Sequence, residues 1–219
     1  MPEIKQTVAV IGGTGDLGSA LALRWGKAGF KIFIGSRNED KAKTTACMLN
    51  QLLGKDSVSG LTNREAASSA EMIVMTVPFS NHGAIVEEIS EAAQGKIVVD
   101  TTVPLVPPKV SRVHLPKEGS IAKRAQNQFG NNVKVVSAFQ TVAATSLSEN
   151  TPNEGEVLVC GNNVEARTQV ILLAESAGLK AWHAGPIDNS VVSESLTPLL
   201  IFLNKRYQMH GAGIRIVQH

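Results

Sequence analysis

Hydrophobic positions along the chain form short continuous runs separated by amphipathic segments. The run from Thr7 to Ile11 is rich in β-branched residues and ends at two glycines, as a buried parallel strand does. The next segment, Asp16 to Ala28, places leucines at helical spacing and stops at Gly29. The alternation continues, with strands expected at Lys31–Gly35, Glu71–Val77, Lys96–Thr102 and Lys134–Phe139 and helices at Glu39–Leu53, Gly83–Ala93 and Ser120–Phe129. This pattern predicts βαβ units and an α/β fold with a mostly parallel sheet.

The pattern changes after Gln140. Residues 141–155 are polar and small, without clear periodicity. Beyond them we expect strands at Glu156–Gly161 and Leu179–Ala184, and helices at Val164–Ala177 and Asn189–Gln208, the last one broken or offset near Pro198. No linker-like stretch separates the two parts. We therefore expect a first domain over residues 1–140 and a smaller C-terminal α/β part, residues 141–219, packed tightly on it.

A glycine-rich turn follows the first strand. Residues 13–18, GTGDLG, match the G-x-G-x-x-G pattern between a buried strand and a helix, which is the context the motif requires. The first glycine allows a tight turn, the second lets the backbone approach a pyrophosphate, and the third permits close packing of helix and strand. Free N–H groups at the helix start favour phosphate. The turn predicts a Rossmann-type, doubly wound domain that binds a dinucleotide, rather than an ordinary glycine-rich connection.

The tip of the second strand indicates which dinucleotide binds. NAD-specific domains usually carry a carboxylate there, about 20 residues past the glycines, to hold the ribose hydroxyls. This chain has Ser36 and Arg37 at that position, with Lys41 one turn into the next helix. Arginine binds phosphate through two parallel hydrogen bonds, and lysine adds a point charge. NADP(H) is therefore favoured, the alternative being that Arg37 and Lys41 are solvated surface charges.

Composition and charge exclude several classes of protein. Of the 219 residues 43% are hydrophobic and 4% aromatic, which suits a core of small aliphatic side chains, and the net charge of +2 gives no strong attraction to nucleic acid or to acidic membranes. Cys47 and Cys160 form no CxxC pair and no zinc-type spacing, so we expect no metal site and a reducing, cytoplasmic location. Residues 1–6 lack the apolar run of a signal peptide, and no apolar stretch is long enough to span a membrane.

The chain shows no acid/base or nucleophile motif, so no catalytic residue is assigned. Its five histidines are scattered, and each is expected to be structural or exposed. His82 alone follows a strand end, where ligands of open α/β sheets bind. Reduction of a ketone usually needs a side chain that exchanges a proton with oxygen. Transfer between two bound hydride carriers mainly needs positioning, which is the interpretation we favour.

Seven segments carry a family resemblance. They occur in the order GGTGDLG (12–18), GSR (35–37), TVP (76–78), VSAF (136–139), VCG (159–161), AGP (184–186) and ESLTPLL (194–200). Together they resemble the NADPH-dependent reductases of coenzyme F420, the 8-hydroxy-5-deazaflavin carrier. The resemblance covers nearly the whole chain, and its C-terminal segments are far more specific than the glycine motif.

The resemblance implies a reversible hydride transfer between nicotinamide C4 and deazaflavin C5, and it assigns cofactor contacts by position. The pyrophosphate would lie against Thr14, Gly15, Asp16 and Leu17, and the 2′-phosphate against Ser36, Arg37 and Lys41. The nicotinamide half would lie against Val77, Asn81, Val103 and Ala144, and the deazaflavin against Gln140, Val142, Ser195 and Leu196. Gln140 departs from the family, whose archaeal members often have histidine there; glutamine offers a donor and an acceptor but cannot become cationic.

Two other functions stay open on these residues. One is an NADPH-dependent flavin or ferric reductase, since related modules occur in metalloreductases; the other is a protein that senses NADPH without turnover. The deazaflavin carries a phosphate and a polyglutamate tail, for which Lys205, Arg206 and Arg215 are the candidate basic residues, a solvated helix end being the alternative. The apolar C-terminal helix (Leu196, Leu199, Leu200, Ile201, Leu203) favours a homodimer.

Overall fold

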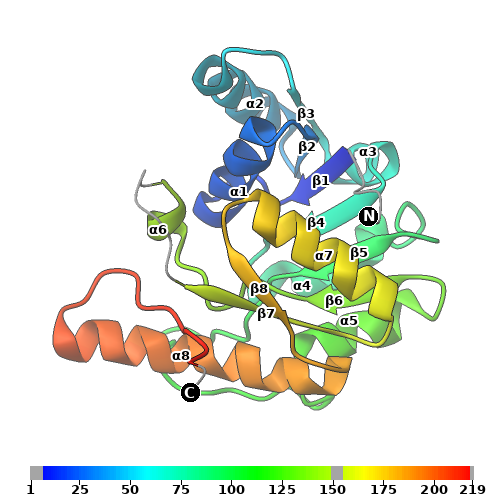
Figure 1. The fold of residues 1–219 in the computed structure, drawn as a ribbon. Helices are drawn as coiled ribbons and strands as arrows, with labels where there is room; N and C mark the ends of the chain where they lie inside the picture. Colours follow the sequence, from blue (N-terminus) through cyan, green and yellow to red (C-terminus); the bar gives the residue numbers. More distant parts are fainter. Residues whose placement is uncertain (1–6, 149–154, 218–219) are drawn as a thin grey trace.

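A single eight-stranded sheet forms the centre of the computed structural model, which describes residues 7–148 and 155–217 (Figure 1). Its strands lie in the order β3-β2-β1-β4-β5-β6-β7-β8. The six strands β1 to β6 are all parallel. Strand β7 pairs antiparallel with β6, and β8 is parallel to β7. Their bounds are Thr7–Ile11, Lys31–Ser36, Val58–Thr62, Met72–Met75, Ile97–Asp100, Lys134–Ser137, Glu156–Gly161 and Lys180–His183, for β1 to β8. The Rossmann-type, mostly parallel α/β fold is thus confirmed, and the strand order reverses between the paired strands β1 and β4, the point at which such sheets bind their ligands.

Helices cover both faces of the sheet because the strands are apolar on both. Val8 and Val10 of β1 face one core cluster, and Ala9 and Ile11 face the other. The first cluster includes side chains of α1 (Asp16–Lys27), α2 (Glu39–Leu53) and α7 (Val164–Ser176). The second includes those of α3 (Asn63–Ser69), α4 (Phe79–Ile89) and α5 (Ile121–Phe129). The longest helix, α8 (Ser190–Tyr207), lies along one side and projects beyond the sheet (Figure 1).

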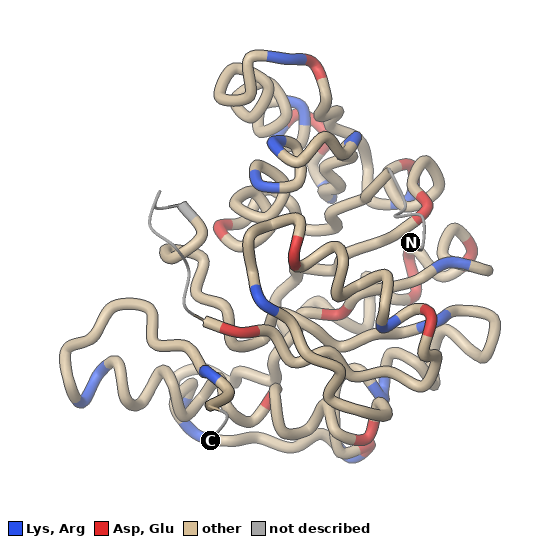
Figure 2. Tube along the Cα trace, viewed as in Figure 1, with Lys and Arg blue, Asp and Glu red and all other residues tan. Residues whose placement is uncertain are grey.

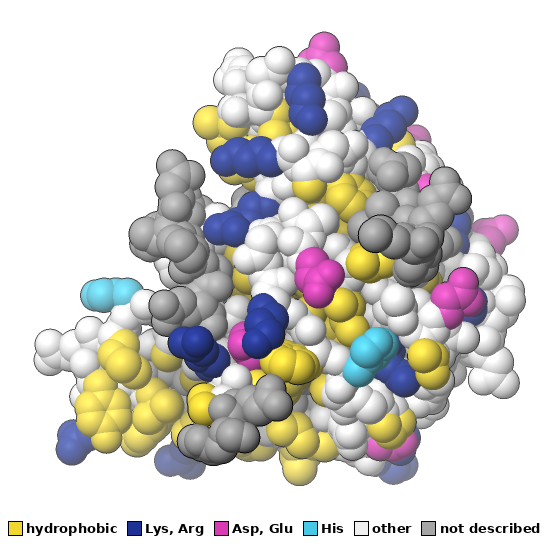
Figure 3. Space-filling model, in the orientation of Figure 1, with side chains coloured by type: hydrophobic (Ala, Val, Ile, Leu, Met, Phe, Trp, Pro, Cys, Tyr) yellow, Lys and Arg dark blue, Asp and Glu magenta, His cyan; other side chains and the backbone are white. Residues whose placement is uncertain are grey.

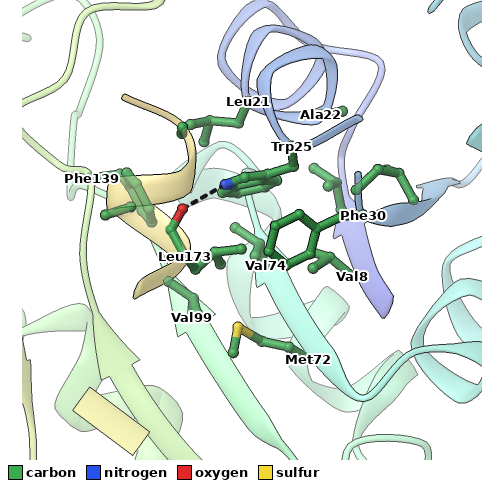
Figure 4. Packing of buried hydrophobic residues seen from close by; sticks show 14 of the residues in the cluster. Val8, Leu21, Ala22, Trp25, Phe30, Met72, Val74, Val99, Phe139 and Leu173 are labelled. Carbon is green, nitrogen blue, oxygen red and sulfur yellow. Dashed lines mark hydrogen bonds between the residues drawn. The ribbon is translucent and has the colours of Figure 1, made fainter. Parts of the chain in front are cut away.

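Trp25 joins the N-terminal and C-terminal parts of the chain. Its side chain is fully buried in α1, and its indole nitrogen donates to the backbone oxygen of Leu173 in α7 at 2.9 Å (Figure 4). The Phe139 ring meets the indole edge-on, with ring centroids 6.0 Å apart. A buried aromatic ring contributes a large apolar area, and its polar atom needs a partner, which Leu173 supplies.

The C-terminal part extends the same sheet rather than forming a second one. Arg24 of α1 strengthens the contact by donating to the backbone oxygens of Leu147, at 2.9 Å, and Ala177, at 2.8 Å. Residues far apart in the chain therefore share one packed interface. A division near residue 141 stays a prediction about folding units, and the predicted polar segment 141–155 lies partly outside the described residues.

Several elements differ from the sequence predictions. The pattern gave no strand or helix between Gly54 and Glu71, where β3 and α3 are found, and none where α6 (Ala144–Ser148) and the short 3₁₀ helix η1 (Ile187–Asn189) form. The expected break near Pro198 is wrong, because α8 continues through it. Proline removes one backbone hydrogen-bond donor from the helix. Pro198 is buried, and its packing compensates for that loss, so the helix is not interrupted.

Charges are mixed over the fold. Figure 2 shows basic and acidic residues interspersed along the trace, in keeping with a net charge of +2. No helix in the described part of the chain has the length and apolar composition of a membrane span. Across residues 7–148 and 155–217, no three His, Cys, Asp or Glu side chains gather in a way that would hold a metal ion.

Candidate functional site

Two adjoining cavities open at the carboxyl ends of β1, β2, β4 and β5. The smaller, of about 310 Å³, borders the glycine turn and the tip of β2, and the larger, of about 560 Å³, borders the segments after β4, β5 and β6. Thr76, Val77 and Pro78 line both. Ligands of open α/β sheets bind at this edge. The three shared residues show that the two cavities adjoin at this edge.

The glycine turn forms the wall of the smaller cavity at the start of α1. A Cβ on Gly18 would lie 2.6 Å from the Thr76 hydroxyl oxygen, so only glycine lets α1 pack this close to β4. A Cβ on Gly15 would meet nothing nearer than the Gly12 oxygen at 3.5 Å. Gly15 also begins α1 without a side-chain cap, which leaves N–H groups for a ligand. The space beside Gly15 therefore fits a phosphate that approaches the backbone.

The tip of β2 supplies the polar groups that were predicted for a 2′-phosphate. Ser36 and Arg37 line the smaller cavity, with Arg37 exposed and Ser36 nearly buried. The Ser36 hydroxyl oxygen accepts from the backbone N–H of Asn38 at 3.1 Å, which holds it at the strand tip. Asn38 in turn caps α2 by accepting from the backbone N–H of Lys41 at 2.9 Å. Lys41 itself is exposed and lines neither cavity.

The larger cavity is mainly apolar. Among the described residues that line it, none is titratable, and the complete set is Leu17, Thr76, Val77, Pro78, Phe79, Ser80, Thr101, Thr102, Val103, Leu105, Pro107, Val110, Phe139, Gln140, Val142 and Thr197. The Thr101 hydroxyl is already bound to the backbone oxygen of Met75 at 2.9 Å. Apolar walls with few polar groups are typical of sites for flat ring systems. The lining of this cavity therefore offers no acid or base among the described residues.

Among the described residues that line this cavity, Gln140 alone has a side-chain amide, and only 6% of its surface is exposed. It follows Phe139, whose φ of 71° lies in the left-handed region that a bulky residue rarely adopts. The hydroxyl of Thr197 in α8 donates to the Gln140 backbone oxygen at 2.8 Å. The turn at Phe139 and the bond from Thr197 thus fix where the Gln140 side chain enters the cavity.

His82 does not reach either cavity. It is fully buried in α4, and its Nε2 lies 2.7 Å from Asp100 Oδ2 at the end of β5. The other oxygen, Asp100 Oδ1, accepts from the backbone N–H of Thr102 at 3.0 Å. His82 is therefore a structural partner that holds the segment after β5, which lines the larger cavity.

Glu194 anchors α8 beside the larger cavity. Its buried carboxylate accepts from the backbone N–H groups of Ile121, at 2.7 Å, and Ala122, at 3.1 Å, at the start of α5. Burial raises the pKa of this carboxyl to about 8, although both hydrogen bonds oppose the rise. The anchored helix presents Thr197 to the cavity. Of the residues predicted to border a deazaflavin, Gln140 and Val142 line this cavity, whereas Ser195 and Leu196 line neither.

The other residues that were predicted to contact a cofactor also lie partly in the cavity linings and partly outside them. Thr14, Gly15 and Asn81 line the smaller cavity, Leu17 and Val103 the larger, and Val77 both. Asp16 and Ala144 line neither, and nor do the exposed Lys205, Arg206 and Arg215. The sequence assigned no ligand contact to Asn63, Thr76 or Thr197, although Thr76 and Thr197 lie in the segments TVP (76–78) and ESLTPLL (194–200).

Comparison with known proteins places this arrangement in context. Residues 7–104 match the family model described as NADP oxidoreductase, coenzyme F420-dependent. The chain is 38% identical to the F420-dependent NADP reductase of Methanocaldococcus jannaschii, over 95% of this chain and 97% of that protein. It is 37% identical to the protein of the same name from Methanothermobacter thermautotrophicus, over 95% and 94%. The similarity to rat metalloreductase STEAP3 is lower, at 27% identity over 90% of this chain but 37% of that protein.

Solved structures share the fold. A crystal structure from Arthrobacter sp. FB24, described as a candidate F420-dependent NADP reductase, aligns with a TM-score of 0.82 at 23% identity, over 98% of this chain and all of the other. Plasmodium falciparum pyrroline carboxylate reductase, solved with NADP bound, aligns with a TM-score of 0.56 at 18% identity, over 82% and 58%. At these identities the likeness shows a common architecture.

Proposed function

Because the chain belongs to the family of coenzyme F420-dependent NADP oxidoreductases, we propose that its two adjoining cavities are the sites of the two cofactors. The protein is an oxidoreductase that uses NADP(H) and coenzyme F420. The observation that carries the assignment of sites is the wall of Thr76, Val77 and Pro78 that the cavities share. A dinucleotide with its phosphates at the glycine turn would place its far end in the larger cavity, where a second ring would meet it.

The smaller cavity would hold the phosphates of NADP(H). Thr14, Gly15, Asp16 and Leu17 stand at the start of α1, where N–H groups and the helix dipole favour the pyrophosphate. Ser36 and Arg37 would bind the 2′-phosphate directly, since both line the cavity. Lys41, one turn into α2, would add positive charge from outside it. The open space beside Gly15 supports this placement.

The larger cavity would hold the nicotinamide and the deazaflavin rings. We place the nicotinamide half against Val77, Asn81, Val103 and Ala144, and the deazaflavin against Gln140, Val142, Ser195 and Leu196. Of these, Val77, Val103, Gln140 and Val142 line the larger cavity, Asn81 lines the smaller one, and Ala144, Ser195 and Leu196 lie outside both linings. The two cofactors supply the chemistry: a hydride passes between nicotinamide C4 and deazaflavin C5, with one proton taken up from or released to solvent. The chain positions the rings, excludes water with apolar walls, and needs no catalytic acid or base of its own.

Spectroscopy of the two cofactors tests the function. Mixing the protein with NADPH and oxidised deazaflavin should bleach the absorbance of both, and NADP⁺ with reduced deazaflavin should restore it. NADH should be a much poorer donor. Reduction of FMN or FAD without reduction of the deazaflavin would favour an ordinary flavin or ferric reductase. Unchanged absorbance with every acceptor would favour a protein that senses NADPH.

The exposed end of α8 supports a homodimer. Leu199, Phe202, Tyr207 and Met209 are between 42% and 65% exposed, and Figure 3 shows hydrophobic side chains gathered at the free end of this helix, at the lower left. An apolar patch that projects from the fold is typical of a protein interface. Light scattering should give the mass of two chains, and Phe202→Glu should give that of one. A wild-type mass of one chain would contradict the homodimer.

We also propose a cytoplasmic location. Cys47 and Cys160 are both free thiols, and Cys47 is exposed. An exposed free thiol persists best in a reducing compartment. Fractionation of the source cells should recover the protein with cytoplasmic markers.

A further inference from the structure

One residue that lines the smaller cavity carries a buried polar atom without a hydrogen-bond partner among the described residues. Asn63 is the first residue of α3, 1% exposed, and lines the cavity together with Ser36 and Arg37. Among the described residues no group donates to its side-chain oxygen, Oδ1. Proteins satisfy most buried acceptors, so an unpaired one beside a binding cavity points to a donor that arrives with the ligand.

The orientation of the Asn63 amide is fixed. Its nitrogen donates to the carboxylate of Glu88 in α4 at 3.1 Å. An ionised carboxylate only accepts hydrogen bonds, so the nitrogen has to face Glu88 and the oxygen has to face away from it. The oxygen lies over Gly35, where a Cβ would come within 3.2 Å of it. Gly35 directly precedes Ser36 and Arg37, so the oxygen stands under the proposed 2′-phosphate end of the nucleotide.

The neighbouring side chains indicate which part of the nucleotide lies there. Ile85 and Pro78 give the same cavity an apolar part of its lining, suited to the face of a purine ring. Phosphate oxygens at neutral pH carry few protons and cannot satisfy an acceptor. The donors available in the adenosine half are the adenine amino group and the ribose 3′-hydroxyl.

We propose that Asn63 is a specificity-determining residue of the nucleotide site, whose Oδ1 accepts a hydrogen bond from the adenosine half of NADP(H). Glu88 is its positioning residue, because it holds the amide nitrogen away from the ligand. This inference rests on the proposed function of the smaller cavity. Asn63 would recognise the base or the ribose, in addition to the recognition of the 2′-phosphate by Ser36 and Arg37. If the donor is the amino group, the site favours adenine over hypoxanthine, which carries a carbonyl oxygen there; if it is the 3′-hydroxyl, the site favours the intact ribose over its 3′-deoxy form.

The test measures dissociation constants by nucleotide fluorescence, without turnover. Wild-type protein is titrated with NADPH, with its hypoxanthine analogue and with its 3′-deoxyribose analogue. The analogue that lacks the donor should bind about five- to tenfold more weakly, the range for one neutral hydrogen bond. A loss with the hypoxanthine analogue identifies the amino group, and a loss with the 3′-deoxy analogue identifies the hydroxyl. Equal affinity for all three nucleotides overturns the proposal without any variant.

Asn63→Leu, which keeps the bulk and removes the acceptor, completes the test. The variant should bind NADPH about as weakly as wild type binds the discriminated analogue, and should no longer distinguish the two. Reduced nicotinamide mononucleotide, which has no adenosine, should show equal kcat/KM with both proteins. Wild-type discrimination retained in Asn63→Leu would overturn the proposal. Failure of the smaller cavity as the nucleotide site would look different, since wild-type protein would then bind no NADPH.

Discussion

The side-chain nitrogen of Gln140 donates to the backbone oxygen of Asp100 at 2.8 Å, and this bond decides which end of the amide faces the larger cavity. The same nitrogen lies 2.8 Å from the Ser137 hydroxyl oxygen. A carbonyl oxygen can only accept, so the Gln140 oxygen has to point away from Asp100, and no described group donates to it. Gln140 therefore presents an acceptor alone, although glutamine in general offers a donor as well.

Gln140→Met should weaken deazaflavin binding and leave NADPH binding unchanged. Methionine keeps the length and removes the acceptor, which a ring N–H of the deazaflavin would use. The expected loss is about 1 kcal/mol, the scale of one neutral hydrogen bond. Fluorescence titration of each cofactor measures it. Unchanged deazaflavin affinity would mean that the Gln140 oxygen faces no donor on that ring.

Two glycines of the turn should respond differently to alanine. Gly18→Ala places a methyl group 2.6 Å from the Thr76 hydroxyl oxygen, so it should lower the free energy of unfolding by about 1–3 kcal/mol through overpacking. Gly15→Ala meets only one atom, at 3.5 Å, and Gly15 has a φ of −86° that alanine adopts readily. It should fold normally and weaken NADPH binding. Urea unfolding and nucleotide titration of both variants separate the effects, and wild-type NADPH affinity in Gly15→Ala would contradict the phosphate assignment.

Arg37→Ala should discriminate between the two nicotinamide nucleotides. A lost charged hydrogen bond to the 2′-phosphate would cost about 1–3 kcal/mol of NADPH binding and almost nothing for NADH. Lys41→Ala is the matched control, and its effect should be smaller because Lys41 lines neither cavity. Equal losses for both nucleotides in Arg37→Ala would remove Arg37 as the 2′-phosphate ligand.

The fold was predictable wherever a strand is buried on both faces. β1 is a continuous apolar run in the sequence and was placed correctly. β3 was missed because only Val58 in it is buried, and because Gly60 reads as a turn residue. In the structure Gly60 is needed because a Cβ there would lie 2.3 Å from the backbone nitrogen of Lys43. α4 begins at Phe79, before the first apolar spacing that the sequence shows, since Pro78 sets its start.

The site was predictable where its groups are contiguous in sequence. The glycine turn and the Ser36–Arg37 pair each lie in one short segment next to a strand. Thr197 was not among the predicted contacts, because the rotation of α8 depends on the hydrogen bonds that Glu194 accepts from α5. The contacts of Ser195 and Leu196 stay predictions. The orientation of Gln140 depends likewise on β5, some 40 residues away in sequence. Such pairings follow from tertiary packing, which no local pattern encodes.

The buried Glu194 carboxyl should make stability depend on pH. Burial raises its pKa to about 8 from its ordinary value of 4.5, with the negative Asp100 adding to the rise. The folded state then holds the proton more tightly than the unfolded state, so its contribution is full below pH 4.5 and is lost as pH rises toward 8. Glu194→Gln cannot titrate, and the stability of wild type relative to it should fall across this window. Urea unfolding at several pH values measures the difference, and parallel pH profiles would contradict the prediction.

The two thiols should react at very different rates. Cys47 is exposed on α2, whereas Cys160 in β7 is 1% exposed, and burial raises the pKa of its thiol to about 11. Its Sγ also contacts the backbone oxygen of Ala184 at 3.7 Å. The thiolate is the reactive form, so at mildly alkaline pH a disulfide reagent should label Cys47 and leave Cys160 intact. Cys47→Ser should therefore react only at the rate of unfolding, and denaturant should release the second thiol in wild type. Rapid labelling of folded Cys47→Ser would show that Cys160 is accessible in solution.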